Sequence, residues 1–361
     1  MAGDEASATF GIDHETTALL NQFKDLPDHW QAGKVRFPLR EVLLLMLVAV
    51  LAGGVAFYGI ERFGERKIEL PRRFLPFANS TPSHDHLGDI FAALDPRAYR
   101  ARFVAWVAAL TGAPPDALAI DGKTSRRSGG KGSTDAIHVV SAFAASQRLV
   151  MGQLKVNAKS NEIVAIPALL DLRSIEGATV TIDAMGCQRE IARKFIDGKA
   201  DYVLALKGNQ GTLREDVEAF VKERRTRGFS AATNSLDGDH GRIETRKTKV
   251  VHDVGWIRER HDWPGLRGVV IVESIRETGD RTERETRYYI TSSTRPAGGL
   301  APYVRGHWSI ENSLHWVMDM SFADDQCRVR TGNAAENFVT VMHMAANLVR
   351  RAPGKDSIRC V

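Results

Sequence analysis

The stretch "ALAIDGKTSRRSGGKG", residues 117–132, joins a short apolar run to an acid, Asp121, and then to a basic, glycine-rich segment. Its "GKT" invites comparison with a phosphate-binding loop. That motif has the form G-x-x-x-x-G-K-[ST] and would need a glycine at position 117, where this chain has Ala117. The glycines of such a loop also separate the strand from the lysine, whereas here the apolar run leads directly into Asp121 and Gly122. We therefore exclude a nucleotide loop and predict a strand that ends on a carboxylate.

A second apolar run ends in the same way. In "VTIDAMG", residues 180–186, Asp183 closes the apolar part, and in both runs an isoleucine precedes the acid and a small residue follows it. One such acid alone is more typical of a loop or a helix cap. Two of them at strand ends of one sheet would face a common crevice, and carboxylate oxygens are the ligands that Mg²⁺ prefers. The pair therefore favours a metal site.

A third acid is expected from a helical segment near the C-terminus. In "HWSIENSLHW", residues 307–316, His307 lies four residues before Glu311 and His315 four residues after it, which is the spacing of one helix face. The pattern is not H-E-x-x-H, so it does not indicate a zinc metalloprotease. The alternative is that both histidines only pack or form hydrogen bonds. Other acids compete for the third position in weaker contexts: Glu162, Glu190 and Asp319.

Composition limits the class of protein. The chain has 361 residues, of which 43% are hydrophobic and 26% charged, as in soluble globular proteins. Its three cysteines form no C-x-x-C pair, which argues against a zinc ribbon or a disulfide framework and for a cytosolic setting. No secretory signal is recognisable, and the apolar run from Val42 to Phe57 is shorter than the ~20 residues of a membrane span, so we predict a buried helix there. A net charge of +5 permits an anionic partner.

Hydrophobic periodicity predicts the order of the elements. Residues 17 to about 110 have helical spacing, with Pro38 before the apolar helix, Ser83 as a cap and Gly112 as a stop. Strands and helices then follow in the order β-β-β-α-β-α-β, which predicts an α/β fold with a mixed sheet and flanking helices. Extended segments of alternating charge come next and predict an all-β insertion, and helices resume at about residue 299.

These changes in pattern predict four regions. The expected boundaries are a helical N-terminal domain over 1–112, a first part of the catalytic domain over 113–212, the β-rich insertion over 213–286, and a second catalytic part with the Glu311 helix over 287–361.

Several segments, taken in order, resemble bacterial insertion-sequence transposases of the ISAs type, a group that includes the H-repeat-associated proteins. They are "AIDGKTSRRS", "TIDAMGCQ", "LALKGNQ", "HGRIETR" and "HWSIENSLHWVMDMSFADDQCRVRTGNAAENF". "FPLREVLLLMLVAVLAGG" and "PSHDHLGDIFAALDP" resemble the helical N-terminal domain that accompanies the catalytic domain in this family. The resemblance covers residues from about 18 to about 358.

The resemblance implies an RNase H-like fold whose catalytic, metal-binding triad is Asp121, Asp183 and Glu311. It implies two Mg²⁺ or Mn²⁺ ions, DNA cleavage at transposon ends and strand transfer into target DNA. The implied partner is double-stranded DNA, bound by a homodimer, and the implied location is the cytoplasm in association with the nucleoid. The N-terminal domain would then bind DNA, by analogy alone.

Basic residues near the acids are expected to contact the DNA backbone. The broader superfamily surrounds its glutamate with a tyrosine, an arginine and a lysine, whereas this chain has Val304, His307 and Met318 in those places. His307 would then take over a phosphate contact from the arginine. Trp256 or Trp263 could stack on an extruded base, although packing is the more common role of a tryptophan. The expected phosphate contacts are Lys123, Arg126, Arg127, His307, Arg328 and Arg330.

Two alternatives stay open at the level of sequence. The chain ends abruptly after "PGKDSIR", where members of the family continue, so a truncated or decayed copy that only binds DNA is one expectation. The other is an RNase H-like nuclease without strand transfer. A metal-dependent cleavage assay and a strand-transfer assay separate these from an active transposase.

Overall fold

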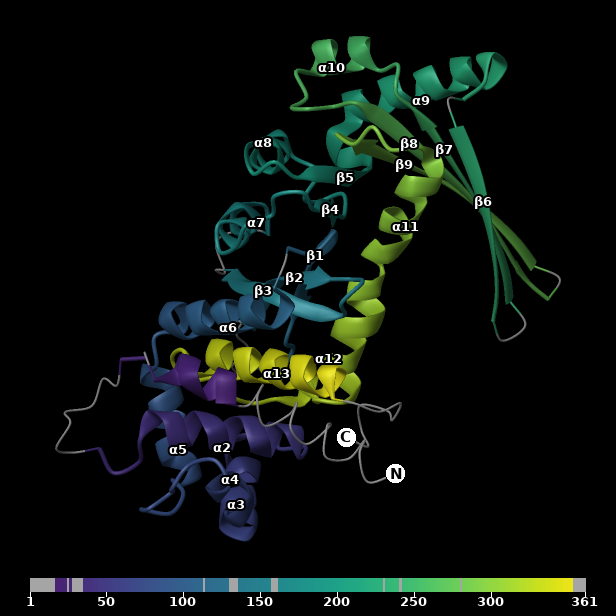
Figure 1. Ribbon diagram of the computed structural model, residues 1–361. Coiled ribbons are helices and arrows are strands. Elements are labelled where there is room, and N and C mark those ends of the chain that lie inside the picture. Colours follow the sequence, from purple (N-terminus) through teal and green to yellow (C-terminus); the bar gives the residue numbers. More distant parts are fainter. Residues whose placement is uncertain are drawn as a thin grey trace, which may run out of the picture.

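A nine-stranded mixed sheet, counted over the described residues, runs through the molecule with helices packed against it (Figure 1). The strand order is β3-β2-β1-β4-β5-β9-β8-β7-β6. The structure is a computed structural model, and it describes residues 17–24, 26–27, 35–112, 114–129, 136–156, 162–229, 231–239, 242–279 and 281–352. Two basic residues, Lys131 and Lys355, lie outside the described residues. So do Asn161, a candidate helix cap, and the cysteine Cys360.

The first five strands form the half of the sheet that carries the predicted aspartates. β1 (Ala117–Thr124) pairs in antiparallel fashion with β2 (His138–Ala144), which pairs likewise with β3 (Leu149–Val156). On its other edge β1 runs parallel to β4 (Thr179–Ile182), and β4 runs parallel to β5 (Asp201–Leu206). The apolar run at the start of β1 is buried, as expected for a central strand covered on both faces. The predicted mixed sheet with flanking helices is therefore confirmed.

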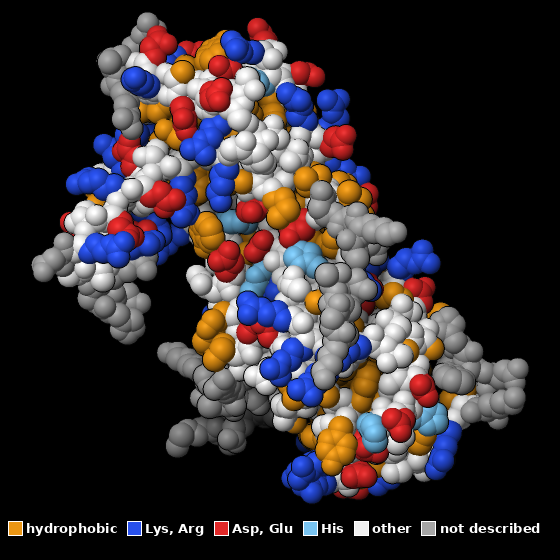
Figure 2. All heavy atoms as spheres, turned by 180° about the vertical axis from the view of Figure 1, so that it is seen from behind, with side chains coloured by type: hydrophobic (Ala, Val, Ile, Leu, Met, Phe, Trp, Pro, Cys, Tyr) orange, Lys and Arg blue, Asp and Glu red, His pale blue; other side chains and the backbone are white. Residues whose placement is uncertain are grey.

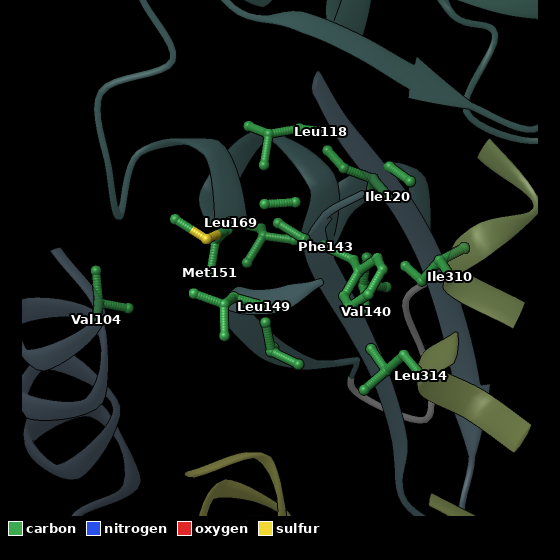
Figure 3. Packing of buried hydrophobic residues seen from close by; sticks show 14 of the residues in the cluster. Val104, Leu118, Ile120, Val140, Phe143, Leu149, Met151, Leu169, Ile310 and Leu314 are labelled. Atoms are coloured by element: carbon green, nitrogen blue, oxygen red, sulfur yellow. The ribbon is translucent and has the colours of Figure 1, made fainter. Parts of the chain in front are cut away.

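Helices cover the two faces of this half-sheet. α7 (Glu162–Leu170) connects β3 to β4 and α8 (Arg189–Asp197) connects β4 to β5, and both lie on one side of the sheet in Figure 1. α11 (Ala297–His307) crosses the other side and contacts β1 and β4. Leu118 of β1 and Leu169 of α7 belong to one buried hydrophobic core (Figure 3).

The N-terminal region is helical, as predicted. Ser83 Oγ accepts a hydrogen bond from the His86 N–H at 3.4 Å, and Gly112 ends its helix with φ 66°. Among the described residues, no helix has both the length and the apolar character that crossing a membrane requires. The helices are residues 17–23, α2 (Leu39–Leu51), α3 (Phe57–Lys67), α4 (Glu69–Arg72), α5 (His84–Ala93) and α6 (Pro96–Thr111).

The last helix, α13 (Ala334–Arg351), joins the N-terminal helices to the sheet. It packs against α2, α5, α6 and β3, and it lies between α6 and α2 in Figure 1. Buried Asn337 donates hydrogen bonds from Nδ2 to the carbonyls of Phe91 and Leu94, both at 2.9 Å. Arg100 and Glu336 form an ion pair at 3.1 Å. The two ends of the chain therefore share one core.

The expected all-β insertion is only partly β, and this part of the prediction is wrong. The segment begins with α9 (Gly211–Arg227) and contains α10 (Gly255–His261). α9 buries Leu213, Val217 and Val221, whose spacing is helical, but its many charges obscure that pattern.

The strands of the insertion do not form a separate sheet. They form an antiparallel meander whose last strand pairs with β5, so the insertion extends the sheet of β1 to β5 to one side (Figure 1). The strands are β6 (Ala231–Asp239), β7 (Arg242–Val251), β8 (Gly268–Thr278) and β9 (Arg281–Thr291).

Candidate active site

Asp121 lies within β1 rather than at its end, which corrects the expected strand boundary. β1 continues to Thr124 because β2 is long enough to pair with residues 121–124 on one edge. β4 is shorter and ends at Ile182, the register partner of Ile120. Asp121 and Asp183 therefore follow paired residues of two parallel strands, at the point where β1 loses one neighbour. Asp183 also accepts a hydrogen bond from the Met185 N–H at 3.0 Å, so it caps its own turn as well.

Glu311 lies on a π-helical turn, Ile310–His315, between α11 and α12 (Trp316–Met320). Such turns are rare and are often found at functional sites. The apolar side of the turn, Ile310 and Leu314, packs against Val140 of β2 and its neighbours (Figure 3). This packing orients the turn, while the Glu311 side chain is exposed.

The widened turn separates the environments of the three residues expected on one helix face. His307 Nδ1 lies 3.2 Å from Thr181 Oγ1 of β4, and His315 Nδ1 lies 3.5 Å from Asp121 Oδ2 of β1. Both rings are largely buried, and burial lowers the pKa of each to about 4. The imidazoles are therefore neutral at physiological pH. Because the His307 ring packs against β4 and is neutral, it could offer a phosphate a hydrogen bond but no charge, and its expected phosphate contact stays a prediction.

The pKa of Asp121 reflects its burial and the charges of the acids around it. Burial is the largest cause that raises the pKa of the Asp121 carboxyl, a backbone hydrogen bond from Gly122 lowers it, and the negative charges of Glu162, Asp183 and Glu311 raise it, to about 7 in all. Glu162, Asp183 and Glu311 are therefore acids whose charges act on Asp121. We call Asp121, Glu162, Asp183 and Glu311 the open acidic group. Figure 2 shows acidic and histidine side chains gathered near the middle of one face, with lysine and arginine side chains beside them.

A different set of acids is the most tightly clustered in the described part of the chain. Carboxylate oxygens of Asp319, Asp324 and Asp325 all lie within 4.8 Å of one another, which the predicted triad does not match. We call these three the closed acidic group, because the Lys123 ammonium lies among them. Its Nζ is 2.7 Å from Asp319, 2.8 Å from Asp324 and 3.5 Å from Asp325. The Ser125 hydroxyl donates to Asp324 at 2.7 Å.

Lys123 is engaged within the protein, and its expected DNA contact stays a prediction. Only 14% of its side chain is exposed, and its charge is paired with carboxylates. Burial lowers the pKa of the ammonium, but the charges of Asp324 and Asp319 outweigh burial and hold the pKa above its ordinary value. The contacts join β1 to the segment that follows α12. The sequence concealed this pairing because the partners lie about two hundred positions away.

The four arginines expected at the DNA backbone are all exposed. Arg126 faces Asp325 at 3.3 Å, and its side chain is 82% exposed. Arg330 Nε donates to the Arg127 carbonyl at 3.0 Å, which brings the segment after β1 beside the segment after α12. Arg328 lies on that second segment. The structure thus brings these basic side chains onto two adjoining segments.

The two tryptophans of the insertion differ in exposure. Trp263 is 2% exposed and packs within the protein, which is the more common role of a tryptophan, whereas Trp256 is 43% exposed and its ring meets the Phe220 ring edge-on at 5.8 Å. Trp308 is exposed and lies under the Arg287 guanidinium at 5.1 Å.

Trp308 lines a cleft of about 590 Å³ between the meander and α11. The cleft reaches Glu311 and Asn312, so it opens onto the open acidic group. Its charged lining residues are Glu244, Arg246, Arg276, Glu285, Arg287, Arg305 and Glu311.

Comparison with known proteins shows which family the chain resembles. Residues 112–348 match the family described as "Transposase DDE domain", and residues 20–107 match the one described as "DDE_Tnp_1-associated". "Putative transposase YncI" of Escherichia coli O157:H7 is 39% identical over 343 residues, covering 92% of this chain and 87% of that protein. "H repeat-associated putative transposase YhhI" of Escherichia coli K12 is 37% identical over 345 residues, covering 93% and 91%.

The comparison with a solved structure adds no support to the family assignment. A piggyBac transposase synaptic complex with hairpin DNA aligns with 94% of this chain and 78% of its own, at a TM-score of 0.37 and 9% identity. A similarity of that level carries no argument.

Proposed function

We propose, from the premise that this chain belongs to the transposase DDE domain family, that it cuts DNA at transposon ends and joins the freed ends to target DNA. The observation that carries the proposal is the open acidic group, in which burial first, and then the charges of the other three acids, raise the pKa of Asp121 to about 7. The order of the first five strands, with an antiparallel β2 beside the parallel β1, β4 and β5, supports the RNase H-like assignment.

The residues of the open acidic group suit a divalent cation. Carboxylate oxygens are the ligands of Mg²⁺ and Mn²⁺, and repulsion among them is relieved when a cation binds. Among the described residues, the basic side chain recorded in contact with Asp121 is His315, whose low pKa leaves it neutral. Asp121, Asp183 and Glu311 would hold the ions, two in number. When bound, such ions activate water and stabilise the entering and leaving oxygens of a phosphodiester.

The chain itself would supply positioning. Asp121 is held by the ladder to β2, Asp183 by the end of β4, and Glu311 by a turn whose apolar side is buried. Carboxylates on such rigid elements keep their geometry better than carboxylates on loops. Arg126, Arg127, Arg328 and Arg330 would hold the phosphate backbone beside them, without reading sequence.

The cleft beside α11 is the proposed path of one DNA strand. It leads to Glu311 and is lined by arginines and by the face of Trp308. Guanidinium groups suit phosphates, and an exposed aromatic ring suits a base. Two copies of the chain would serve the two ends of one element.

The test is Mg²⁺-dependent cleavage of duplex DNA that carries the terminal sequence flanking the coding region. Asp121→Asn, Asp183→Asn and Glu311→Gln should each lower the cleavage rate by about a thousandfold or more, since several kcal/mol of transition-state stabilisation is lost. Asp197→Asn, at an exposed acid on α8, is the control and should cleave normally. Undiminished cleavage in the Asp121 or Asp183 variant would contradict the assignment. Cleavage without strand transfer would favour a nuclease, and DNA binding without cleavage a decayed copy.

A further inference from the structure

Glu162 approaches β1 at the one residue that has no side chain to exclude it. A Cβ added at Gly122 would collide with the carboxylate of Glu162 and with the His138 ring. The glycine after Asp121 therefore does more than follow the acid, because its bare backbone leaves the space that these two side chains fill. This places the Glu162 carboxylate against the residue next to Asp121.

His138 holds that carboxylate in place. Its Nε2 lies 2.7 Å from Glu162 Oε1, and its Nδ1 lies 2.7 Å from Thr124 Oγ1, the register partner of His138 across β1 and β2. A carboxylate can only accept, so Nε2 must donate to Glu162, while Nδ1 pairs with the Thr124 hydroxyl. Both ring nitrogens are engaged, which fixes the ring. The second oxygen of Glu162 is free of this hydrogen bond.

The position of Glu162 also keeps its carboxylate away from bulk water. Only 14% of its side chain is exposed, so this charge is poorly screened by water. A neutral, packed position would suffice if Glu162 served only to attach α7 to the sheet.

We propose that Glu162 is a fourth carboxylate ligand of the metal site, and that His138 and Gly122 are there to position it. The inference rests on the proposed function, because it concerns the metal ions of the same site. It adds an acid from the first turn of α7 to the acids of β1, β4 and the π-helical turn. Sequence reasoning had ranked Glu162 among the weaker candidates because nothing local ties it to Asp121.

The experiment measures Mn²⁺ binding to the full chain by titration calorimetry and by the electron paramagnetic resonance of free Mn²⁺, without DNA. Glu162→Gln keeps the size of the side chain and an oxygen for His138, and should weaken Mn²⁺ binding about tenfold or more. Glu162→Asp keeps the charge but withdraws the carboxylate, and should lie between the wild type and Glu162→Gln. The matched control is Glu190→Gln, at an exposed glutamate in the first turn of α8, which should bind as the wild type does.

His138→Gln tests the positioning role. It should weaken Mn²⁺ binding about tenfold while leaving the Glu162 charge in place. In cleavage assays, both variants should need more metal for half-maximal rate, and metal-free binding to end-containing DNA should not change. Circular dichroism and urea unfolding verify that each variant is folded.

The outcomes separate this inference from the proposed function. If Glu162→Gln and Glu162→Asp bind Mn²⁺ as the wild type does while Asp121→Asn loses it, Glu162 has a structural role and the inference is overturned. If the wild type and Asp121→Asn bind Mn²⁺ equally, the metal site itself is wrong and the proposed function fails. Weakened binding in the Glu162 variants with an unchanged Glu190→Gln control supports the inference.

Discussion

The open and closed acidic groups differ in what balances their charge. In the closed group, three carboxylates lie within 4.8 Å and surround the Lys123 ammonium. In the open group, burial and like charges raise the pKa of Asp121 to about 7, and its recorded histidine neighbour is neutral. Distance alone would select the closed group as a metal site. We propose unbalanced charge as the criterion instead, because a cluster that already contains a cation has no need of another.

Removal of that built-in cation should have the largest effect on stability. Lys123→Met leaves three carboxylates together in a largely buried place, so we expect a loss of about 3–5 kcal/mol in the free energy of unfolding, measured in urea. The control is Lys199→Met, whose pair with Glu176 is exposed and should matter by less than about 1 kcal/mol.

Lys123→Met also tests whether the ammonium distinguishes the closed group from the open group. If the ammonium is what keeps metal out, millimolar Mn²⁺ should restore part of the stability that Lys123→Met loses. Adding Asp324→Asn to Lys123→Met should also restore stability, because one of the unpaired charges is then gone. A variant that is as stable as the wild type, with no response to Mn²⁺, would show that the closed group does not depend on Lys123.

Sequence reasoning succeeded where local pattern carries the information. Asp121 and Asp183 each follow an apolar run, so their strands and the place of both strands in one sheet could be predicted from a few adjacent residues. Pro38, Ser83 and Gly112 mark helix ends for equally local reasons. The mixed sheet followed from the order of these elements.

The remainder depends on contacts that no local pattern contains. The carboxylates that pair with Lys123 lie about two hundred positions away, so the sequence alone predicted a contact between Lys123 and DNA. The turn around Glu311 is π-helical, and a change in hydrogen-bond ladder leaves the apolar spacing almost unaltered. Glu162 is near Asp121 only because Gly122 has no side chain.

Loss of charge in the open group should change how stability depends on pH. The Asp121 pKa is 3.8 in an unfolded chain and about 7 in the fold, so between these values the folded state holds the additional proton and stability falls as pH rises. The full difference corresponds to at most ~4 kcal/mol. In EDTA, Asp121→Asn should therefore gain stability relative to the wild type from pH 5 to pH 8, as measured by urea unfolding.

Comparing the stability of Asp121→Asn with that of the wild type at the same pH cancels the contributions of other titrating groups. Burial lowers the pKa values of His307, His315 and His343 to about 4, 4 and 3, which makes stability rise with pH in both proteins alike. Asp197→Asn, at an exposed acid, should track the wild type. A constant difference between Asp121→Asn and the wild type would mean that the charge of the open group is balanced after all.

The smallest expected effect concerns DNA binding beside the closed group. Arg330 is exposed and oriented by the Arg127 carbonyl, so Arg330→Ala should lower the slope of log K against log salt by about 1, the loss of one phosphate contact. Arg126 already faces Asp325 at 3.3 Å, so part of its charge is spent within the protein, and Arg126→Ala should lower the slope by less. Arg193→Ala, on α8, is the control. Equal slopes for the Arg126 and Arg330 variants would mean that the ion pair with Asp325 does not reduce the contribution of Arg126 to DNA binding. Lys123 alone would then balance the charge of the closed group.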